Sequence, residues 1–342
     1  MKMNIKTKKH IDRLLELAKN ESFTDGSISE PFVEALNGMD DLNREEKIEV
    51  KVAVSKGMLE VKSVFGASVL AIWLGGAVEN GDSPELYLDA ILEKFLAIAK
   101  SLDLPISDEE DAFDYDAYIE NMDEGLKQGL QFFGQSLVAH IARSPQKRKE
   151  IQHNSEIIET IESLIPVSYG ALWIDELLKK VSNDLVVIHA EQHVAVRVRY
   201  KNLSNCFHLF TLLQEALVEV MPDSQKIENK ELLLFAKGLI PDLDEVSDKA
   251  WWHYGIASST EANIVASIWG EMSPMGISTI DDEQIILLWS PIMGSRSWDG
   301  SFFTPFLEAT PPSVELLEVL NQDETKQYLE KCGLSTKRQE NQ

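Results

Sequence analysis

The sequence predicts an α+β protein, in which a mostly α-helical N-terminal domain is followed by an α+β domain with an antiparallel or mixed sheet. Three observations lead to this class. Apolar residues recur at three- and four-residue steps through the first 180 residues, apolar and polar residues alternate soon after position 183, and the 342-residue chain exceeds the size at which one hydrophobic core keeps growing. We therefore expect a helical domain over 1–182, a tryptophan-rich α+β domain over 183–334 and a polar tail over 335–342.

Helix-start signals and apolar stripes divide the N-terminal half into helices. Asn43 and Glu46 have the spacing of a capping box, which predicts a long helix that begins near Arg44. Residues 48–54 alternate between apolar and polar side chains, however, and fit a strand equally well. Further helical stripes occupy 11–18, 31–37, 58–77, 84–98, 126–141, 155–164 and 171–181.

The uncharged run from Ser63 to Val78 is the one candidate for a membrane span. It contains sixteen residues, whereas a helix needs about 20 apolar residues to cross a bilayer. Lys62 and Glu79 flank the run closely. We therefore expect a buried core helix here and no insertion into a membrane.

A change of periodicity near Asn183 marks the start of the second domain. The apolar run 185–189 and the alternation over 194–200 predict a β-hairpin, and Asp281-Asp282 between two further apolar runs is typical of a second hairpin turn. The other elements expected here are helices over 204–221 and 231–237, an acidic loop over 241–249, strands over 251–257, 263–269, 277–280 and 284–289, a surface loop over 294–300, and a C-terminal helix capped by Ser313, with a last helical turn that ends at Cys332.

Charge and cysteine content restrict the partners and the compartment. The chain has 57 acidic and 32 basic residues, which gives a formal net charge of −25. Such a charge repels nucleic acid and anionic membranes, so we expect a protein partner that is basic. Cys206 and Cys332 are the only cysteines and have no neighbours at metal-ligand spacing, which favours the reducing cytoplasm over a disulfide-bonded secreted protein.

Residues 101–125 contain ten acids and no base. They lack the alternating ligands, the glycine and the final glutamate of a calcium-binding loop. A solvated face explains such a run, and a docking surface for a basic partner is the functional alternative.

Five of the seven tryptophans lie between Ala250 and Gly300. Because an indole buries a large apolar surface and carries an N–H that needs a partner, this cluster predicts either a dense core or a lined pocket. The candidate ligand-binding residues in this stretch are Trp269, Glu271, Arg296 and Trp298, with His253 as a further member. A packed sheet with an Arg–Glu pair at its rim, and a hydrogen-bonded histidine in its core, is the structural alternative.

No catalytic motif is present to define an activity. His189, Glu191 and His193 resemble a zinc-protease motif, but Ala190 occupies the place of the glutamate and the flanking residues favour strands. The sequence contains no nucleophile elbow, phosphate-binding loop or dinucleotide fingerprint, so we assign no catalytic residues, metal or cofactor. The resulting hypothesis is a cytosolic acidic binding protein, possessing no catalysis of its own, that holds a protein partner, as an inhibitor or immunity protein does. An enzyme or small-ligand sensor with a tryptophan-lined pocket is the alternative.

Overall fold

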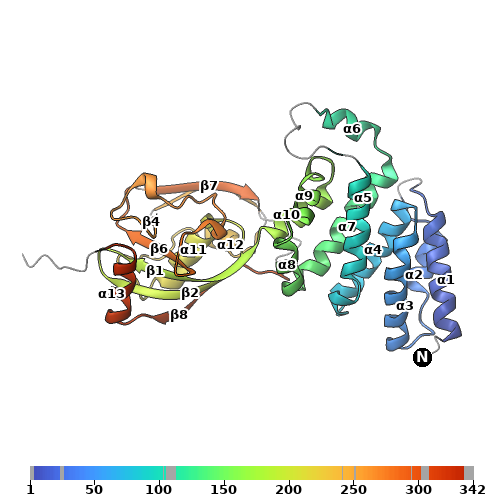
Figure 1. Cartoon of the computed structure of the whole chain (residues 1–342), viewed down its shortest axis with the longest axis horizontal. Helices are drawn as coiled ribbons and strands as arrows, with labels where there is room; N and C mark the ends of the chain where they lie inside the picture. Colours follow the sequence, from blue (N-terminus) through green and yellow to red (C-terminus); the bar gives the residue numbers. More distant parts are fainter. Residues whose placement is uncertain are drawn as a thin grey trace, which may run out of the picture. The chain divides into compact units, whose positions relative to one another are not determined.

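The computed structural model describes residues 4–23, 27–102, 104, 113–240, 242–249, 252–293, 295–301 and 308–334, and it leaves the side chains of 242–249 and 295–301 undescribed. The chain divides into two compact units, 1–178 and 179–342. Helices build the first unit and a mixed sheet with helices builds the second, so the predicted α+β class is confirmed (Figure 1). The helix α10 ends the first unit at Leu178, and the first strand begins at Val181.

The first unit is built from helices. Their bounds are α1 (Ile5–Asn20), α2 (Glu30–Asn37), α3 (Arg44–Gly57), α4 (Val64–Glu79), α5 (Leu88–Ser101), α6 (Tyr115–Asn121), α7 (Glu124–Ala142), α8 (Pro145–Gln152), α9 (Ser155–Glu162) and α10 (Tyr169–Leu178). Asn43 caps α3 in a capping box with Glu46, so residues 48–54 are helical and the strand alternative is wrong. In this unit α4 and α7 lie between α1–α3 on one side and α8–α10 on the other (Figure 1).

The apolar helix α4 lies inside this unit, as predicted for the run from Ser63 to Val78. Ser136 of α7 donates a hydrogen bond to the Ala71 carbonyl oxygen of α4 at 2.6 Å, which joins the two central helices. No helix in the described part of the chain is both long and apolar enough to cross a membrane.

Close backbone contacts fix how α7 crosses α10. A Cβ atom placed on Gly134 would lie 2.2 Å from the Gly170 Cα atom, and one on Gly170 would lie 2.6 Å from the Leu130 carbonyl oxygen. Neither distance leaves room for a methyl group, so glycine at both positions allows the helix backbones to touch.

The second unit contains a six-stranded mixed sheet in the order β4-β6-β1-β2-β8, with the short strand β5 beside β6. β1 runs parallel to β6 and antiparallel to β2, and the other pairs are antiparallel. The bounds are β1 (Val181–His189), β2 (Val194–Leu203), β4 (His253–Ile256), β5 (Thr279–Ile280), β6 (Glu283–Trp289) and β8 (Ser313–Val319), with helices α11 (Cys206–Leu217), α12 (Lys230–Ala236) and α13 (Gln322–Lys331). A separate two-stranded ladder pairs β3 (Asp242–Lys249) with β7 (Ser295–Ser301).

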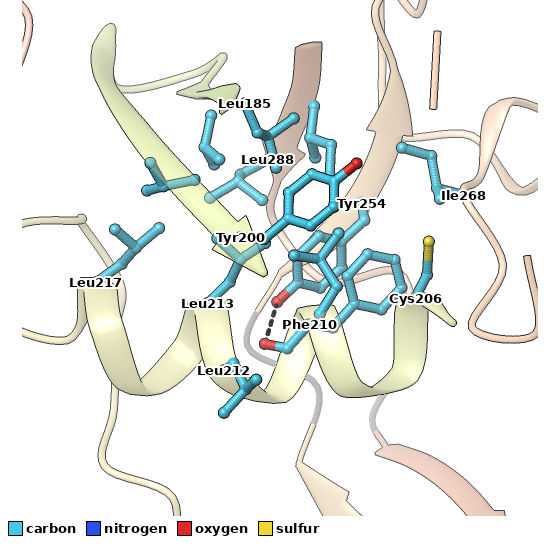
Figure 2. Close-up of a cluster of buried hydrophobic side chains, with 14 of the residues drawn as sticks. Leu185, Tyr200, Cys206, Phe210, Leu212, Leu213, Leu217, Tyr254, Ile268 and Leu288 are labelled. Atoms are coloured by element: carbon cyan, nitrogen blue, oxygen red, sulfur yellow. Dashed lines mark hydrogen bonds between the residues drawn. The ribbon is translucent and has the colours of Figure 1, made fainter. Parts of the chain in front are cut away.

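Helices cover both faces of the six-stranded sheet. Val187 of β1 belongs to the core that includes α11, whereas its neighbours Val186 and Ile188 belong to the core that includes α13. Figure 2 shows the first of these cores, where Leu213 and Leu217 of α11 lie below the strand side chains. Because both faces of the sheet are covered, β1 is continuously apolar from Leu185 to Ile188 instead of alternating with polar residues.

Four expected elements of the second unit are wrong. Residues 241–249 and 294–300 were expected to be loops, but β3 and β7 pair with each other across a long sequence separation. Ser313 begins the strand β8 instead of capping a helix, because β8 pairs with β2. Asn263 caps a short 3₁₀ turn by accepting a hydrogen bond from the Val265 backbone N–H, and this local contact replaces the expected strand over 263–269.

Candidate functional site

A pocket of about 260 Å³ lies at the edge of the sheet, beside β4. Its described lining comes from four segments: α11, β4, the loop 267–271 and the segment 291–293 that follows β6. The strand order places β4 at one end of the sheet, so the pocket opens where the ladder of strands stops.

The floor of the pocket consists of packed aromatic rings. Phe210 of α11 stacks on Tyr254 of β4 with ring centroids 3.8 Å apart, and Trp252 meets Tyr254 edge-on. The Tyr254 hydroxyl donates to the Phe210 carbonyl oxygen at 3.4 Å (Figure 2). The Trp252 indole N–H donates to the Pro222 carbonyl oxygen at 3.1 Å. These rings are buried and hold their polar atoms in hydrogen bonds, so they form a rigid surface.

The loop that forms one wall is fastened to both the sheet and the helix. The backbone N–H of Ile268 donates to the Tyr254 carbonyl oxygen at 2.8 Å, and the backbone N–H of Phe207 donates to the Gly270 carbonyl oxygen at 2.9 Å. A Cβ atom on Gly270 would lie 2.2 Å from the Phe207 ring. Glycine is therefore required for the loop to lie against Phe207, which also lines the pocket.

Exposed apolar side chains surround the opening. Trp269 lines the pocket with 48% of its surface exposed, and Ile292 and Met293 line it from the other side while remaining exposed. Val265 and Ile264 do not line the pocket, but they lie in the 3₁₀ turn that precedes this wall in the sequence, and both are exposed, Val265 to 88%. Apolar side chains gathered at a pocket in this way are typical of a surface that a partner covers.

The charge around the opening has one sign. Residues 252–293 include five acids and no lysine or arginine, but Asp281 pairs with Lys331 and Glu283 with Arg197, and neither of these two acids lines the pocket. Glu271 is exposed, and it is the one acidic side chain among the described residues that line the pocket; none of these is a lysine or arginine. The opening therefore attracts positively charged groups.

Three of the five residues predicted from the sequence as a ligand site line this single pocket: His253, Trp269 and Glu271. His253 is buried at the start of β4, opposite Trp289 of β6. The backbones of Arg296 and Trp298 lie in β7, opposite Asp248 and Val246 of β3, while their side chains lie outside the described part of the structure.

The sequence did not indicate the contribution of α11 or of the segment 291–293. Phe207 and Phe210 lie three residues apart near the start of the helix, outside its main leucine stripe. Phe210 also belongs to the core beneath α11, so its place in the helix gave no separate sign of a pocket, and only the half-buried Phe207 departs from the core pattern.

The tryptophan-rich stretch is partly core and partly pocket. Trp252 is fully buried in the core beneath α11, and Trp289 packs on the opposite face of the sheet. Trp269 is at the pocket opening, and Trp251 lies outside the described residues.

The histidine motif is divided between a strand and a turn. His189 ends β1 with its side chain fully buried, and its Nε2 lies 3.4 Å from the Asp223 carboxylate. Burial lowers the pKa of His189. Glu191 accepts a hydrogen bond from the Ser290 backbone N–H at 3.0 Å, and His193 has a left-handed backbone with φ of 55°. No three His, Cys, Asp or Glu side chains within the described ranges form a group that would hold a metal ion.

The acidic run over 101–125 is described in part. Residues 103 and 105–112 lie outside the described ranges, and 115–121 form α6. Asp114 caps α6 and Asp123 caps α7, each by accepting a hydrogen bond from a backbone N–H of the first turn. These two carboxylates therefore have structural roles.

No protein-family model, curated protein or solved structure matches this chain.

Proposed function

We propose that this protein is an acidic binding protein without its own catalysis, and that its C-terminal unit holds a basic protein partner at the pocket beside β4. The observation that carries the proposal is the set of exposed apolar side chains around the opening. Trp269 and Met293 line the pocket, and Val265 precedes its wall. Covering them with a partner removes apolar surface from water, which is the main favourable term in protein association.

Charge supports a basic partner. The net charge of −25 and the absence of lysine and arginine from residues 252–293 favour attraction of cationic surfaces and repel nucleic acid. Charged groups around an interface chiefly raise the association rate and select partners, while the apolar contact supplies most of the affinity.

We propose the cytoplasm as the location. Both cysteines are free and buried, and burial raises the pKa of the Cys206 thiol to about 12 and that of the Cys332 thiol to about 11. Thiols of this kind are unreactive and suit a reducing compartment.

Site-directed photo-crosslinking tests the binding surface. A photoreactive amino acid at Val265, which is 88% exposed, should capture one discrete protein in cells that express the chain natively. The matched control carries the same group at Ile5, which is 86% exposed in the other unit. Capture from position 265 alone, through a segment rich in lysine or arginine, is the expected result.

Binding of the purified partner then measures the contribution of the surface. Val265→Asp places a charge in the contact and should weaken binding about tenfold or more, because a buried unpaired charge is costly. Binding should also weaken as salt is added. Equal capture from positions 265 and 5, or unchanged affinity of the Val265→Asp variant, would refute the proposal.

A small-ligand sensor or enzyme is the second candidate. The observation in its favour is that His253, Trp269 and Glu271 line one pocket with aromatic walls, the composition expected of a ligand site. A small molecule that raises the unfolding temperature of the wild type and leaves that of Glu271→Ala unchanged would support this role. If no such molecule displaces a protein partner from the pocket, the result would argue against a small-ligand site there.

A further inference from the structure

We propose that the pocket beside β4 receives an arginine side chain of the partner, and this inference rests on the binding function proposed above. Aromatic walls, a single carboxylate at the opening and a small volume together define the ligand. Each of these features is matched by a property of the guanidinium group.

The walls are suited to a flat cation. Five of the thirteen described lining residues are aromatic, whereas aromatic residues make up 8% of the chain. They are Phe207, Phe210, Trp252, Tyr254 and Trp269, of which Phe207 and Trp269 keep accessible surface for a ligand while the other three are buried in the floor. The electron-rich faces of such rings attract cations, and arginine is the cation most often found against them in proteins.

The carboxylate at the opening selects charge and geometry. Glu271 follows Gly270, whose contact with Phe207 fixes the loop, so its backbone has a defined position at the pocket. A carboxylate accepts two parallel hydrogen bonds from a guanidinium group, which a lysine ammonium cannot offer. No lysine or arginine among the described lining residues competes for Glu271.

The size of the pocket favours one side chain. Sites for drug-sized molecules enclose about 300–1,000 Å³, and the pocket here is about 260 Å³. Arginine is also more weakly hydrated than lysine, so it loses less when it leaves water for an aromatic surface. A leucine or methionine would fill the same space but would gain nothing from Glu271.

Three tripeptides test the inference on the full-length protein: acetyl-Gly-Arg-Gly-amide and its citrulline and norleucine counterparts. Citrulline keeps the shape of arginine without the charge, and norleucine is apolar. Binding is followed by NMR through the indole N–H signal of Trp269, which is assigned with the Trp269→Phe variant. We expect the arginine tripeptide to bind about tenfold more tightly than either counterpart, as charge-assisted hydrogen bonds and cation–π contacts predict.

Two carboxylate variants test whether the preference for arginine depends on Glu271. Glu271→Gln should remove most of the preference for arginine over citrulline. Glu261→Gln is the matched control, because Glu261 is an exposed carboxylate in the same region of the chain that does not line the pocket, and the two variants change the net charge equally. Both glutamates are exposed, so the variants should fold as the wild type does.

The outcomes separate this inference from the proposed function. Equal binding of arginine and citrulline, tighter binding of norleucine, no response to the arginine tripeptide, or equal losses in the two glutamine variants would each overturn the arginine site. If Val265→Asp still weakens partner binding in that case, the binding function stands with an apolar anchor. If Val265→Asp has no effect on the partner, the binding function itself fails, whatever the tripeptides show.

Discussion

Lowering the pH from 7 to 5 should destabilise the helical unit through one buried side chain, His140 of α7. Its Nδ1–H donates to the Ser136 carbonyl oxygen at 2.7 Å, and Nε2 is buried without a hydrogen-bond partner in the described structure. Burial lowers the pKa of His140 from 6.5 to about 4, and the charge of Arg143 also lowers it, against smaller opposing effects of the Ser136 hydrogen bond and of Glu85. Over this pH interval the unfolded chain binds the proton and the folded chain does not, so stability falls as the pH falls.

The size of the effect follows from the pKa shift. Stability should fall by about 2 kcal/mol between pH 7 and pH 5 and by about 3 kcal/mol once both states are protonated. Urea unfolding at the two pH values measures it, and His140→Asn should remove this loss while keeping a donor near Ser136. The comparison of variant with wild type also cancels the pH effect of His208, whose pKa burial lowers to about 4.

His153 provides a matched control for this prediction. Its Nδ1 contacts the Lys149 carbonyl oxygen at 2.7 Å, four residues back as in His140, but its side chain is exposed. His153→Asn makes the same substitution at an exposed histidine with the same backbone contact, so it controls for the substitution itself. If His140→Asn has the same pH dependence as the wild type, then His140 accepts its proton in the folded state and the reasoning from burial is wrong.

Three further predictions concern stability and are all measured by urea unfolding. Gly170→Val should lower the free energy of unfolding by about 3 kcal/mol, because the added Cβ meets a backbone oxygen at 2.6 Å. Gly76→Ala, whose Cβ meets nothing within 4 Å, should raise it by about 0.5–1 kcal/mol. Similar effects at the two sites would contradict the crossing geometry. Gln284→Leu should cost about 1–3 kcal/mol because it removes the acceptor of the buried Tyr200 hydroxyl at 2.8 Å, and adding Tyr200→Phe should restore part of the loss. Asn43→Ala should cost about 1 kcal/mol through loss of the α3 cap, and no change would mean that the cap is not needed.

Local signals predicted the elements that local contacts stabilise. The spacing of Asn43 and Glu46 identified the start of α3, where both capping hydrogen bonds are formed. Asp281 and Asp282 were expected to form a hairpin turn, and both adopt the left-handed backbone that such a turn requires, with φ of 51° and 66°. In each case the residues that carry the signal are also the residues that make the contact.

Distant pairing explains the elements that were predicted wrongly. Val314, Leu317 and Leu320 have the spacing of a helical stripe, but β8 pairs with β2 and packs Val314 and Leu316 against the core beneath α11. Tertiary contact therefore overrides the local period. β3 and β7 were mistaken for loops for the same reason, since each finds its partner far away in the sequence.

The candidate site was also predictable only where its residues lie close together in the sequence. His253, Trp269 and Glu271 were recognised because they belong to one aromatic stretch, and the structure brings them to one pocket. Phe207 and Phe210 reach that pocket from α11, some forty residues earlier, only because the helix packs beside β4. No rule based on sequence spacing relates residues that are distant in the sequence and meet only in the folded protein.

The parallel pair at the centre of the sheet has a consequence for synthesis on the ribosome. β1 can form its hairpin with β2 as soon as β2 has emerged, but its other neighbour, β6, begins only at Glu283. Closing so long a loop carries an entropic cost before any contact repays it, so β6 joins late. Until then the nascent chain leaves one edge of β1 unpaired along its buried second half, and we expect this interval to be when the protein depends most on chaperones.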